Sequence, residues 1–367
     1  MLFEAIGPYS AIAKIAMTEV LAAINAGYSV TVVAKQLDES LRGRVEWLKL
    51  YVPPRGFALQ WLTARHFYKQ ALGNRKFDVV HAHQPQTASL ADVFECHYLT
   101  RVAYQTGTLE GRKSLRGRLI RMQQQIVLHA EDHYYRRFSR GTRMLYNSAL
   151  TQENFHACYG ILPKEQVLLS GCPPIAFPDQ AHRAAARERL LGNQSPAAKD
   201  KLVVGYLGGI QRRKGYDALI AAVASDPDLF LLMGGQYTDN FAMPSLSGRG
   251  KGVGLVSDVS TFYSACDVFV VPSLYEPFGL VCFEAAARGL PVIMTPQVGA
   301  APHLAEFGAG IIWNPPQPLG PLARQAVADR AIFNAGTAKM ADAYSESKRA
   351  EKLVEIWQRA AAEKRYT

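Results

Sequence analysis

The feature that most constrains the fold of this chain is a regular alternation of short apolar runs with helical patterns. In the first half, apolar and β-branched runs occur at residues 30–34, 77–83, 93–98, 144–147 and 167–170. A second series occupies residues 202–207, 229–233, 253–256, 268–271, 291–295 and 310–313. Because crossover connections between parallel strands are usually helices, this alternation predicts an α/β fold with parallel sheets covered on both faces.

The length of the chain, 367 residues, indicates two domains, since one domain usually takes about 100–200 residues. A stretch at 173–200 begins with two adjacent prolines and continues with polar residues, as linkers do. We therefore expect a Rossmann-like doubly wound domain at residues 1–172 and a second one at 201–340, facing each other across a central cleft. Residues 341–367 contain an amphipathic helix that packs on the second sheet or crosses back to the first domain.

The composition is that of a soluble globular enzyme, with 49% hydrophobic residues, 20% charged residues and no internal repeat. The five cysteines form no C-x-x-C pair, so we expect buried free thiols in a reducing cytosol rather than disulfides or a zinc site. The first residues enter a strand-like run without a charged leader, and no apolar stretch is long enough to span a bilayer. A cytoplasmic location is expected.

Much of the net charge of +10 lies in one segment. Between Arg101 and Arg143 there are ten Lys or Arg residues against three acids, a local excess of +7. Tyr104, Tyr134 and Tyr135 lie among them, and basic side chains beside aromatic ones suit an anionic membrane surface or a phosphorylated acceptor. The alternative is a solvated helix face. We expect peripheral attachment to the inner face of the cytoplasmic membrane and no nucleic-acid partner.

Two glutamates stand out in the segment 267–292. A buried strand is followed by a short loop that carries Glu276 and by a helix that carries Glu284 eight residues later. Both carboxylates can point to the carboxyl end of the sheet, where ligands of open α/β sheets bind, and can accept hydrogen bonds from sugar hydroxyls. Taken alone, such a pair is more often two solvated charges.

A second candidate site follows the strand at residues 202–207. The strand runs into Gly208 and Gly209, and then into Arg213 and Lys214 at the start of a helix. Glycines let a ligand approach the backbone, and cations beside helix amides suit a diphosphate whose charge grows as a glycosidic bond breaks. A basic helix cap is the alternative interpretation.

The motifs together resemble a known family. Glu276 to Glu284, with Pro-Phe-Gly between them, is similar to the E-x7-E signature of retaining GT-B glycosyltransferases, specifically glycosyltransferase family 4. The order of the neighbouring motifs fits as well: Lys-Gly at Lys214, then Asp-Val-Phe-Val-Val-Pro-Ser, then Glu-Pro-Phe-Gly-Leu-Val, and Gly-Leu-Pro-Val from Gly289. The likeness is strong over about residues 201–315. The first half matches less closely, through Phe-Asp-Val-Val-His-Ala-His and the strand that ends at His97.

The resemblance implies a role for each matching residue. Glu284 would bind the ribose hydroxyls, and Arg213 and Lys214 would hold the diphosphate. Glu276 would hold the donor sugar together with the backbone of Phe278, Gly279 and Leu280. His97 is similar to the family's cleft histidine, which contacts the donor sugar, although a lone histidine is more often structural.

The chain departs from the family pattern at two places. Gly209 stands where many members carry an arginine, and Arg213 would then supply that charge, as in enzymes that resemble the lipopolysaccharide core glucosyltransferases. The glycine pair after the first strand is replaced by Ser10 and Ala11. Gly7, Ser10 and Lys14 are therefore the candidate acceptor-side residues of that loop.

No metal or cofactor is expected. Asp226 and Asp228 spell a D-x-D motif, but they precede an apolar strand as a turn does. His81 and His83 share one strand face without a visible third ligand, so a structural or acceptor role is favoured. A glycine-rich stretch at residues 248–254 fails the P-loop spacing and is expected to be a flexible loop.

The function predicted is retaining transfer of a hexose from a nucleotide-diphosphate sugar, with UDP-sugar favoured, to a cell-envelope glycolipid or saccharide. One alternative is a GT-B nucleotide-sugar epimerase, which needs no acceptor. Another is a non-catalytic basic module that binds membrane or nucleic acid. The basic segment has no purpose in the epimerase, and the paired charged sites have none in the binding module.

Overall fold

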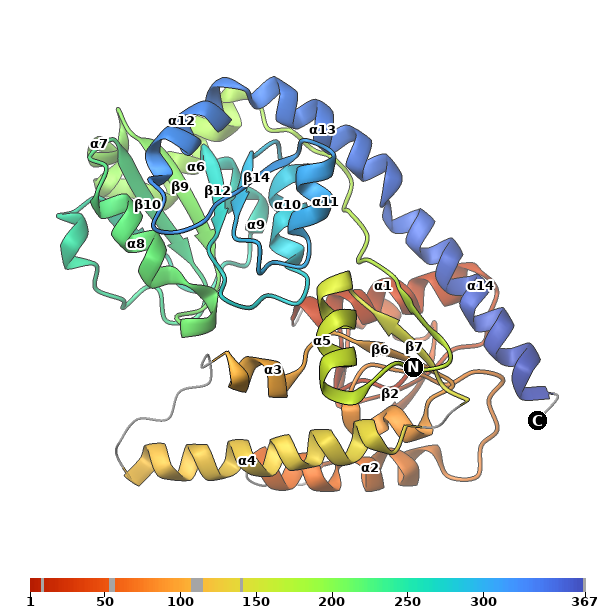
Figure 1. Ribbon diagram of the computed structural model, residues 1–367. Coiled ribbons are helices and arrows are strands. Elements are labelled where there is room, and N and C mark those ends of the chain that lie inside the picture. The colour runs from red at the N-terminus through yellow and green to blue at the C-terminus, as the bar shows by residue number, and fades with distance from the viewer. Residues whose placement is uncertain (8–9, 53–56, 107–114, 139–140, 366–367) are drawn as a thin grey trace. The chain divides into compact units, whose positions relative to one another are not determined.

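The protein forms two compact units, seen here in a computed structural model that describes residues 1–7, 10–52, 57–106, 115–138 and 141–365 (Figure 1). The first unit contains residues 1–105, 115–171 and 346–365 of the described chain, and the second contains Thr106 and Cys172–Ser345. Both are α/β, as the sequence predicts. No helix in these described ranges is long and apolar enough to cross a membrane.

The first unit is built on parallel strands. Their bounds are β1 (Ala5–Ile6), β2 (Thr31–Ala34), β3 (Gln36–Leu37), β4 (Glu46–Lys49), β5 (His81–Ala82), β6 (Val93–Cys96), β7 (Arg143–Tyr146) and β8 (Glu165–Val167). The main order is β5-β6-β7-β8, and Leu2 bridges both Val33 of β2 and Ala82 of β5, which joins the β2–β4 pair to that sheet. The chain therefore starts in the middle of the sheet and winds outward in both directions, as a doubly wound domain does.

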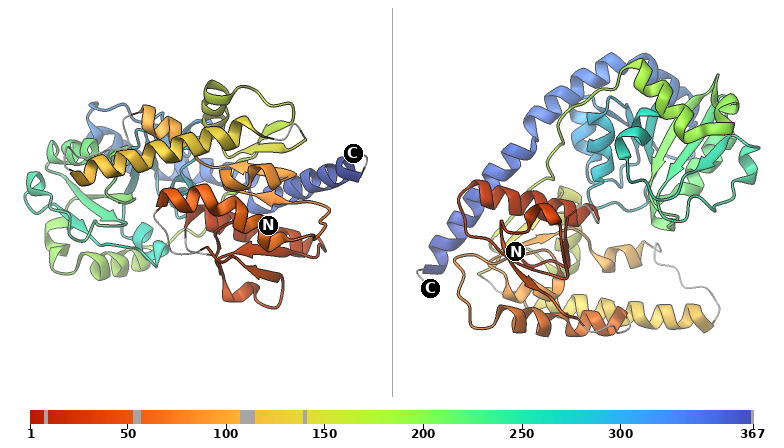
Figure 2. Two further views of the ribbon diagram at one scale, coloured as in Figure 1. Left: turned by 90° about the horizontal axis from the view of Figure 1, so that it is seen from below. Right: turned by 180° about the vertical axis from the view of Figure 1, so that it is seen from behind.

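Helices cover this sheet, and one of them comes from the end of the chain. They are α1 (Ala11–Asn25), α2 (Phe57–Leu72), α3 (Thr100–Gln105), α4 (Leu115–Arg136), α5 (Ala149–Tyr159) and α14 (Glu346–Arg365), with short 3-10 turns η1 (Glu39–Leu41) and η2 (Pro85–Leu90). α14 packs beside α1, as Figure 1 and the right view in Figure 2 show. Its apolar face, Leu353, Ile356 and Trp357, is buried against Val93 and Leu145 of the sheet.

The second unit has one six-stranded parallel sheet. Its strands are β9 (Leu202–Leu207), β10 (Leu229–Gly234), β11 (Gly250–Gly252), β12 (Val268–Val271), β13 (Val292–Met294) and β14 (Gly310–Ile312), in the order β11-β10-β9-β12-β13-β14. This is the doubly wound order in which the first strand lies centrally, and the direction of winding reverses between β9 and β12. Ligands of such sheets bind at the carboxyl ends of the strands beside this reversal.

The helices of the second unit complete its two covering layers. They are α6 (Gln180–Leu191), α7 (Ser195–Ala198), α8 (Tyr216–Ala224), α9 (Val259–Ser264), α10 (Leu280–Ala287), α11 (Ala301–Glu306), α12 (Leu319–Ala328) and α13 (Arg330–Ala343), with turns η3 (Gly192–Gln194), η4 (Arg212–Lys214) and η5 (Pro244–Leu246). β10 and β12 are buried along their whole length, which is why their sequences are continuous apolar runs.

Three expectations about elements are wrong. The predicted linker at 173–200 contains α6 and α7, and α6 packs on α9 while its Arg183 and Arg187 form ion pairs with Asp267. The alanine- and arginine-rich sequence there is a helix former, which the proline-based boundary argument overlooked. The terminal helix begins at Glu346 rather than 341, because residues up to Ala343 complete α13.

The third error concerns the strand predicted at residues 253–256 and the flexible loop predicted at 248–254. The strand is instead β11 (Gly250–Gly252), within the glycine-rich stretch. A side chain at Gly252 would meet the Thr238 carbonyl oxygen at 1.7 Å, so the backbones approach too closely for any residue but glycine. Arg249 fixes the entry to β11 by donating to the carbonyls of Val223, Asp226 and Leu229.

Candidate active site

The candidate site lies at the carboxyl ends of β9 and β12, where two loops meet. Gly215, which ends η4, has a positive φ of 66°, and a side chain there would lie 1.8 Å from the Pro272 carbonyl oxygen. The Leu274 amide donates to the Arg213 carbonyl at 2.8 Å. The glycine therefore lets the loop after β9 rest directly on the loop after β12, and this contact brings the two predicted motifs together.

Three charged side chains converge where these loops meet. Lys214 Nζ forms a short ion pair with Glu276 Oε2, and Arg213 NH1 lies 3.5 Å from the same oxygen. Arg213 also donates from Nε to Gln211 Oε1 at 3.1 Å. The side chains of Arg213, Lys214 and Glu276 are 21%, 18% and 13% exposed, so they are partly desolvated yet open to a ligand. Two cations share one carboxylate, which leaves a local positive excess suited to an anion.

A third loop holds Glu276 in place. The Glu276 amide donates to the Gln297 carbonyl at 3.0 Å, and its own carbonyl accepts from the Gly299 amide at 2.9 Å. The Ala300 amide donates to the Phe278 carbonyl at 2.8 Å. Since residues 297–300 follow β13, the candidate loop is fixed between the ends of β9, β12 and β13.

The helix α10 begins at the same loop. Gly279 is its N-cap in a left-handed conformation, with φ of 91°, and a side chain there would lie 2.9 Å from Val298. The first N–H groups of a helix have no partner within it. The backbone at Phe278, Gly279 and Leu280 therefore forms a helix start that favours oxygen-rich or anionic ligands.

Glu284 lies on the second turn of α10, half-buried. Its Oε2 accepts a hydrogen bond from the Tyr263 hydroxyl at 3.1 Å. Burial raises the pKa of the Cys282 thiol, Glu276 and Glu284 raise it further, and Lys214 opposes them. Glu284 therefore lies on the helix that starts at the Glu276 loop, and Tyr263 orients its carboxylate.

Comparison with known proteins finds a family match for the part of the chain that contains this site. Residues 190–320 match the model of a family described as glycosyl transferases group 1. Of solved structures, the lipopolysaccharide biosynthesis glycosyltransferase WaaG is similar over 97% of this chain and 98% of its own, with a TM-score of 0.74 and 19% identity. Part of the chain thus matches a glycosyltransferase family, and the whole chain has the GT-B fold.

Other similar proteins of this kind come from several bacteria. A D-inositol 3-phosphate glycosyltransferase of Geodermatophilus obscurus is 28% identical over 323 residues, which cover 78% of this chain and 67% of that protein. The lipopolysaccharide core biosynthesis glycosyltransferase LpsE of Rhizobium meliloti is 40% identical over 106 residues, 27% of this chain and 31% of that protein. Anabaena HepE, solved with UDP and glucose, has a TM-score of 0.66 and 17% identity over 97% of this chain and 98% of its own.

The first unit gives His97 a buried position. His97 follows β6 as expected, but it is only 6% exposed, and its Nε2 lies 2.9 Å from His83 Nδ1 in a stacked pair of rings. Burial lowers the pKa of His97 to about 3. A contact of His97 with the donor sugar stays a prediction, and the described contacts of its ring all lie inside the first unit.

The loop after the first strand leads to the amino end of α1. Ser10 caps this helix by accepting from the Ala13 amide at 3.2 Å, and Gly7, with φ of 147°, donates its amide to the Ala13 carbonyl. Lys14 lies on the first turns of α1 and is exposed. Residues 8 and 9, between them, lie outside the described residues.

Two residues of the site were missed in the sequence. Tyr263, on α9, holds Glu284, and Gly215 lets the two loops touch. Gly215 is the glycine of the Lys-Gly motif, so its αL turn was a signal available in the sequence. Tyr263 gave none, because its contact depends on how α9 and α10 pack.

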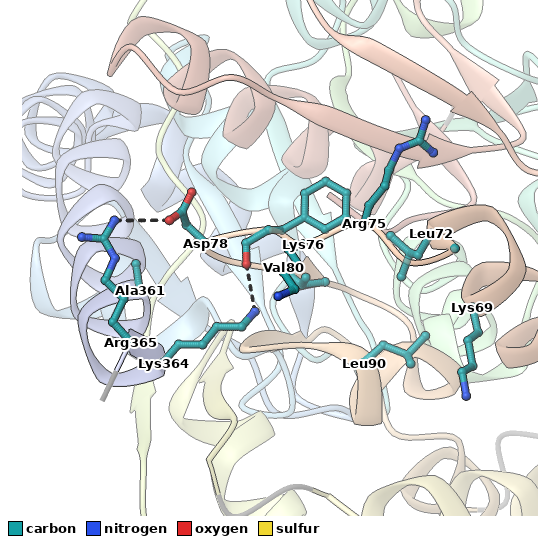
Figure 3. Close-up of a pocket in the computed structure, with 12 residues that line it drawn as sticks. Lys69, Leu72, Arg75, Lys76, Asp78, Val80, Leu90, Ala361, Lys364 and Arg365 are labelled. Carbon is teal, nitrogen blue, oxygen red and sulfur yellow. Dashed lines mark hydrogen bonds and ion pairs between the residues drawn. The ribbon is translucent and has the colours of Figure 1, made fainter. Parts of the chain in front are cut away.

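A basic cavity of about 560 Å³ in the first unit is not part of this site (Figure 3). It lies on the amino side of β5, where α2 and α14 end. Its cations include Lys69, Arg75, Lys76, Lys364 and Arg365. Lys364 binds the Phe77 carbonyl and Arg365 pairs with Asp78 at 3.2 Å. Helix carboxyl ends attract such cations, so the pocket's charge follows from its place in the fold.

Proposed function

We propose that this glycosyltransferase moves a hexose from a nucleotide-diphosphate sugar to an acceptor of the cell envelope, with retention of anomeric configuration, as members of glycosyltransferase family 4 do. The observation that carries the proposal is the convergence of Arg213 and Lys214 on Glu276 at the start of α10. This arrangement combines cations for a diphosphate with a carboxylate and helix amides for sugar hydroxyls.

Each residue then has a role in donor binding. Arg213 and Lys214 hold the diphosphate, and a bound diphosphate would compete with Glu276 for them. This exchange would free the Glu276 carboxylate to accept hydrogen bonds from the hexose hydroxyls. Glu284, oriented by Tyr263, would accept from the ribose hydroxyls. UDP-sugar is the favoured donor, in keeping with the UDP held by Anabaena HepE.

Retention follows when the acceptor hydroxyl attacks from the face that the diphosphate leaves. A diphosphate oxygen takes the proton of the acceptor, while Arg213 and Lys214 stabilise the charge that develops on the leaving group. We propose that the reaction needs no metal, since these two cations provide the charge. Asp226 and Asp228 precede β10 at the opposite edge of the sheet, and both pair with Arg324.

The acceptor is proposed to be a glycolipid or saccharide at the inner face of the cytoplasmic membrane. Two relatives act, by name, on inositol 3-phosphate and in lipopolysaccharide core biosynthesis. Within this chain, the first half of α4 exposes Leu119, Ile120 and Met122, which are 52%, 39% and 55% accessible, next to Arg118 and Arg121. Apolar side chains between cations suit an anionic membrane surface.

The epimerase is the second candidate function, and the site alone does not oppose it, because it would bind the same donor. Calorimetric titration with uridine, guanosine and adenosine diphosphate sugars tests donor binding, and a product assay with and without saccharide or glycolipid acceptors tests transfer. We expect one donor to bind, transfer only with acceptor, a retained anomeric configuration by NMR, and activity that survives a metal chelator. Free epimerised sugar without acceptor would replace the proposal by the epimerase, and failure to bind any donor would leave the binding module.

A further inference from the structure

Four buried polar side chains lie in a row in the first unit. Glu19 belongs to α1, His83 follows β5, Glu95 lies in β6, and His97 follows it. Each is at most 6% exposed. His83 Nε2 is 2.9 Å from Glu19 Oε2, His83 Nδ1 is 2.9 Å from His97 Nε2, and His97 Nδ1 is 3.7 Å from Glu95 Oε1.

Arg349 of α14 joins the two ends of this row, Glu19 and Glu95. Its NH2 group donates to Glu19 Oε1 at 2.7 Å and to Glu95 Oε1 and Oε2 at 3.0 and 2.7 Å. Two ionised carboxylates and one guanidinium would leave one net negative charge in a fully buried place. Such a charge is costly unless a further positive charge or a proton offsets it.

A metal ion is one way to offset that charge, because donor atoms of Glu19, His81, His83 and Glu95 lie within 4.8 Å of one another. Their existing partners oppose it. Arg349 places a positive charge against both carboxylates. The Trp357 indole donates to His81 Nδ1 at 3.1 Å, so His81 carries its proton on Nε2 and presents no free lone pair.

The number of hydrogens available to these four side chains indicates a bound proton rather than a metal ion. There are three gaps between the four groups, and two neutral imidazoles supply only two N–H groups for them. Whichever tautomers are chosen, one gap places an acceptor against an acceptor. His97 Nδ1, at one end, is among the buried atoms of the described residues that make no hydrogen bond. One additional proton would fill the third gap and neutralise the cluster.

We propose that Glu95 holds this proton at neutral pH and directs it toward His97 Nδ1, 3.7 Å away, so that the polar side chains from Glu95 through His97 and His83 to Glu19 connect α14 to the rest of the first unit. The proton lies on Oε1, which faces His97 and is the Glu95 oxygen farther from Arg349. Both imidazoles are neutral with their protons on Nε2, and Glu19 is the ionised partner of Arg349. This is a proton-binding site outside the candidate active site, and it does not depend on the proposed function.

The environment of each group agrees with this assignment. Burial raises the pKa of Glu95, with Arg349 opposing, and burial lowers the pKa of His83 to about 4. The other facing groups are Met1, whose Sδ is 3.1 Å from His83 Nε2 and whose buried α-amino group has its pKa lowered to about 5, and Glu346, whose pKa burial raises. These two titrate in parent and variants alike, so a comparison between proteins removes them.

Glu19 and Glu95 form a matched pair for the test, because both carboxylates contact Arg349. In Glu95→Gln, the amide donates to His97 as the acid does, so we expect a fold of parental stability near pH 7 in denaturant titrations of the full chain. Above the ordinary glutamate pKa of about 4.5, the folding equilibrium constant of the parent should fall about tenfold more per pH unit than that of Glu95→Gln, since the parent holds one proton that its unfolded chain releases. Equal pH dependence, or large destabilisation of Glu95→Gln at pH about 7, would overturn the proposal.

Glu19→Gln should be strongly destabilised at every pH, because Arg349 then lacks its ionised partner. Equal losses in the two variants would mean that both carboxylates are ionised, and the assignment fails. Should Glu19→Gln not fold, infrared spectroscopy of the folded proteins decides. We expect a protonated-carboxyl band that is lost in Glu95→Gln and kept in Glu131→Gln, whose carboxylate is also buried. Native mass spectrometry that finds a bound metal would equally refute the proton.

Discussion

At the scale of single residues, Lys214 and Arg213 compete for one oxygen of Glu276, and this competition has a consequence for catalysis. A ligand phosphate can replace the carboxylate at both cations. In the proposed reaction, the ion pair would therefore keep the cations in place before the donor binds and limit the reorganisation needed at the reacting centre.

Replacing Lys214 by Ala should lower kcat by roughly 100- to 1000-fold, the usual cost of removing one group that stabilises developing charge. Replacing Glu276 by Ala should abolish turnover, because the hydroxyls of the donor sugar lose the carboxylate that accepts their hydrogen bonds. The matched control is Lys201→Ala, since Lys201 binds the Pro227 carbonyl at the opposite edge of the same sheet. Steady-state kinetics and circular dichroism check both points. Near-normal turnover in both site variants would remove the assignment.

Tyr263 should act as a positioning residue for Glu284. Tyr263→Phe keeps the buried ring and removes the hydroxyl that holds the carboxylate, a hydrogen bond worth about 1.5–3 kcal/mol. We expect the KM for donor to rise roughly tenfold with kcat nearly unchanged, since ribose binding takes part in ground and transition states alike. A double-mutant cycle with Glu284→Ala should cancel the effect. Tyr344→Phe is the control, because its hydroxyl faces His303.

How far residues could be assigned from sequence depended on where their partners lie. Lys214 belongs to one motif, and Glu276 and Glu284 belong to another. The two motifs follow neighbouring strands, so a common location at the carboxyl edge of the sheet was predictable. His97 was not, because its surroundings include Glu95 and, through it, Arg349 from the last helix. No sequence pattern near His97 indicates a buried neighbour as distant in sequence as Arg349.

At the scale of elements, the apolar runs predicted the strands well because burial sets both. The runs at 202–207 and 268–271 coincide with β9 and β12. β11 was missed because it consists of Gly250, Lys251 and Gly252, whose sequence lacks an apolar run. Its place is set by close approach of the backbone, a property of neighbouring loops rather than of the strand itself.

α4 is the element on which membrane attachment should depend. Replacing Leu119 and Met122 by Ser removes exposed apolar surface, and replacing Arg118 and Arg121 by Gln removes charge. In vesicle sedimentation we expect each pair to weaken binding to anionic vesicles, about 1 kcal/mol for each lost cation, and only the first pair to weaken the binding that remains at high salt.

The control for α4 is Ile332→Ser on α13, an exposed apolar residue of the second unit. It should bind vesicles as the parent does. If the parent protein does not bind anionic vesicles, or if the α4 variants bind them as well as the parent, the basic segment is a solvated helix face.

At the scale of the whole molecule, the second unit is built mainly from one continuous stretch, Cys172–Ser345. The chain leaves the first unit at residue 171, completes the second by Ser345, and returns as α14 to pack on α1. The sequence allowed this return but also allowed packing on the second sheet. Amphipathic periodicity shows that a helix has an apolar face without showing what covers it.

Because each unit has its own buried core, the two should unfold in separable steps, and α14 should belong to the first unit's step. Leu353→Ala on α14 and Leu231→Ala on β10 delete the same atoms from fully buried positions in the two cores. Each should cost about 2–5 kcal/mol. In calorimetry of the full chain, Leu353→Ala should lower one transition and Leu231→Ala the other, and a donor nucleotide should raise only the transition that Leu231→Ala lowers. If both variants shift one and the same transition, the units unfold as one cooperative body and the stability of α14 cannot be separated from that of the donor site.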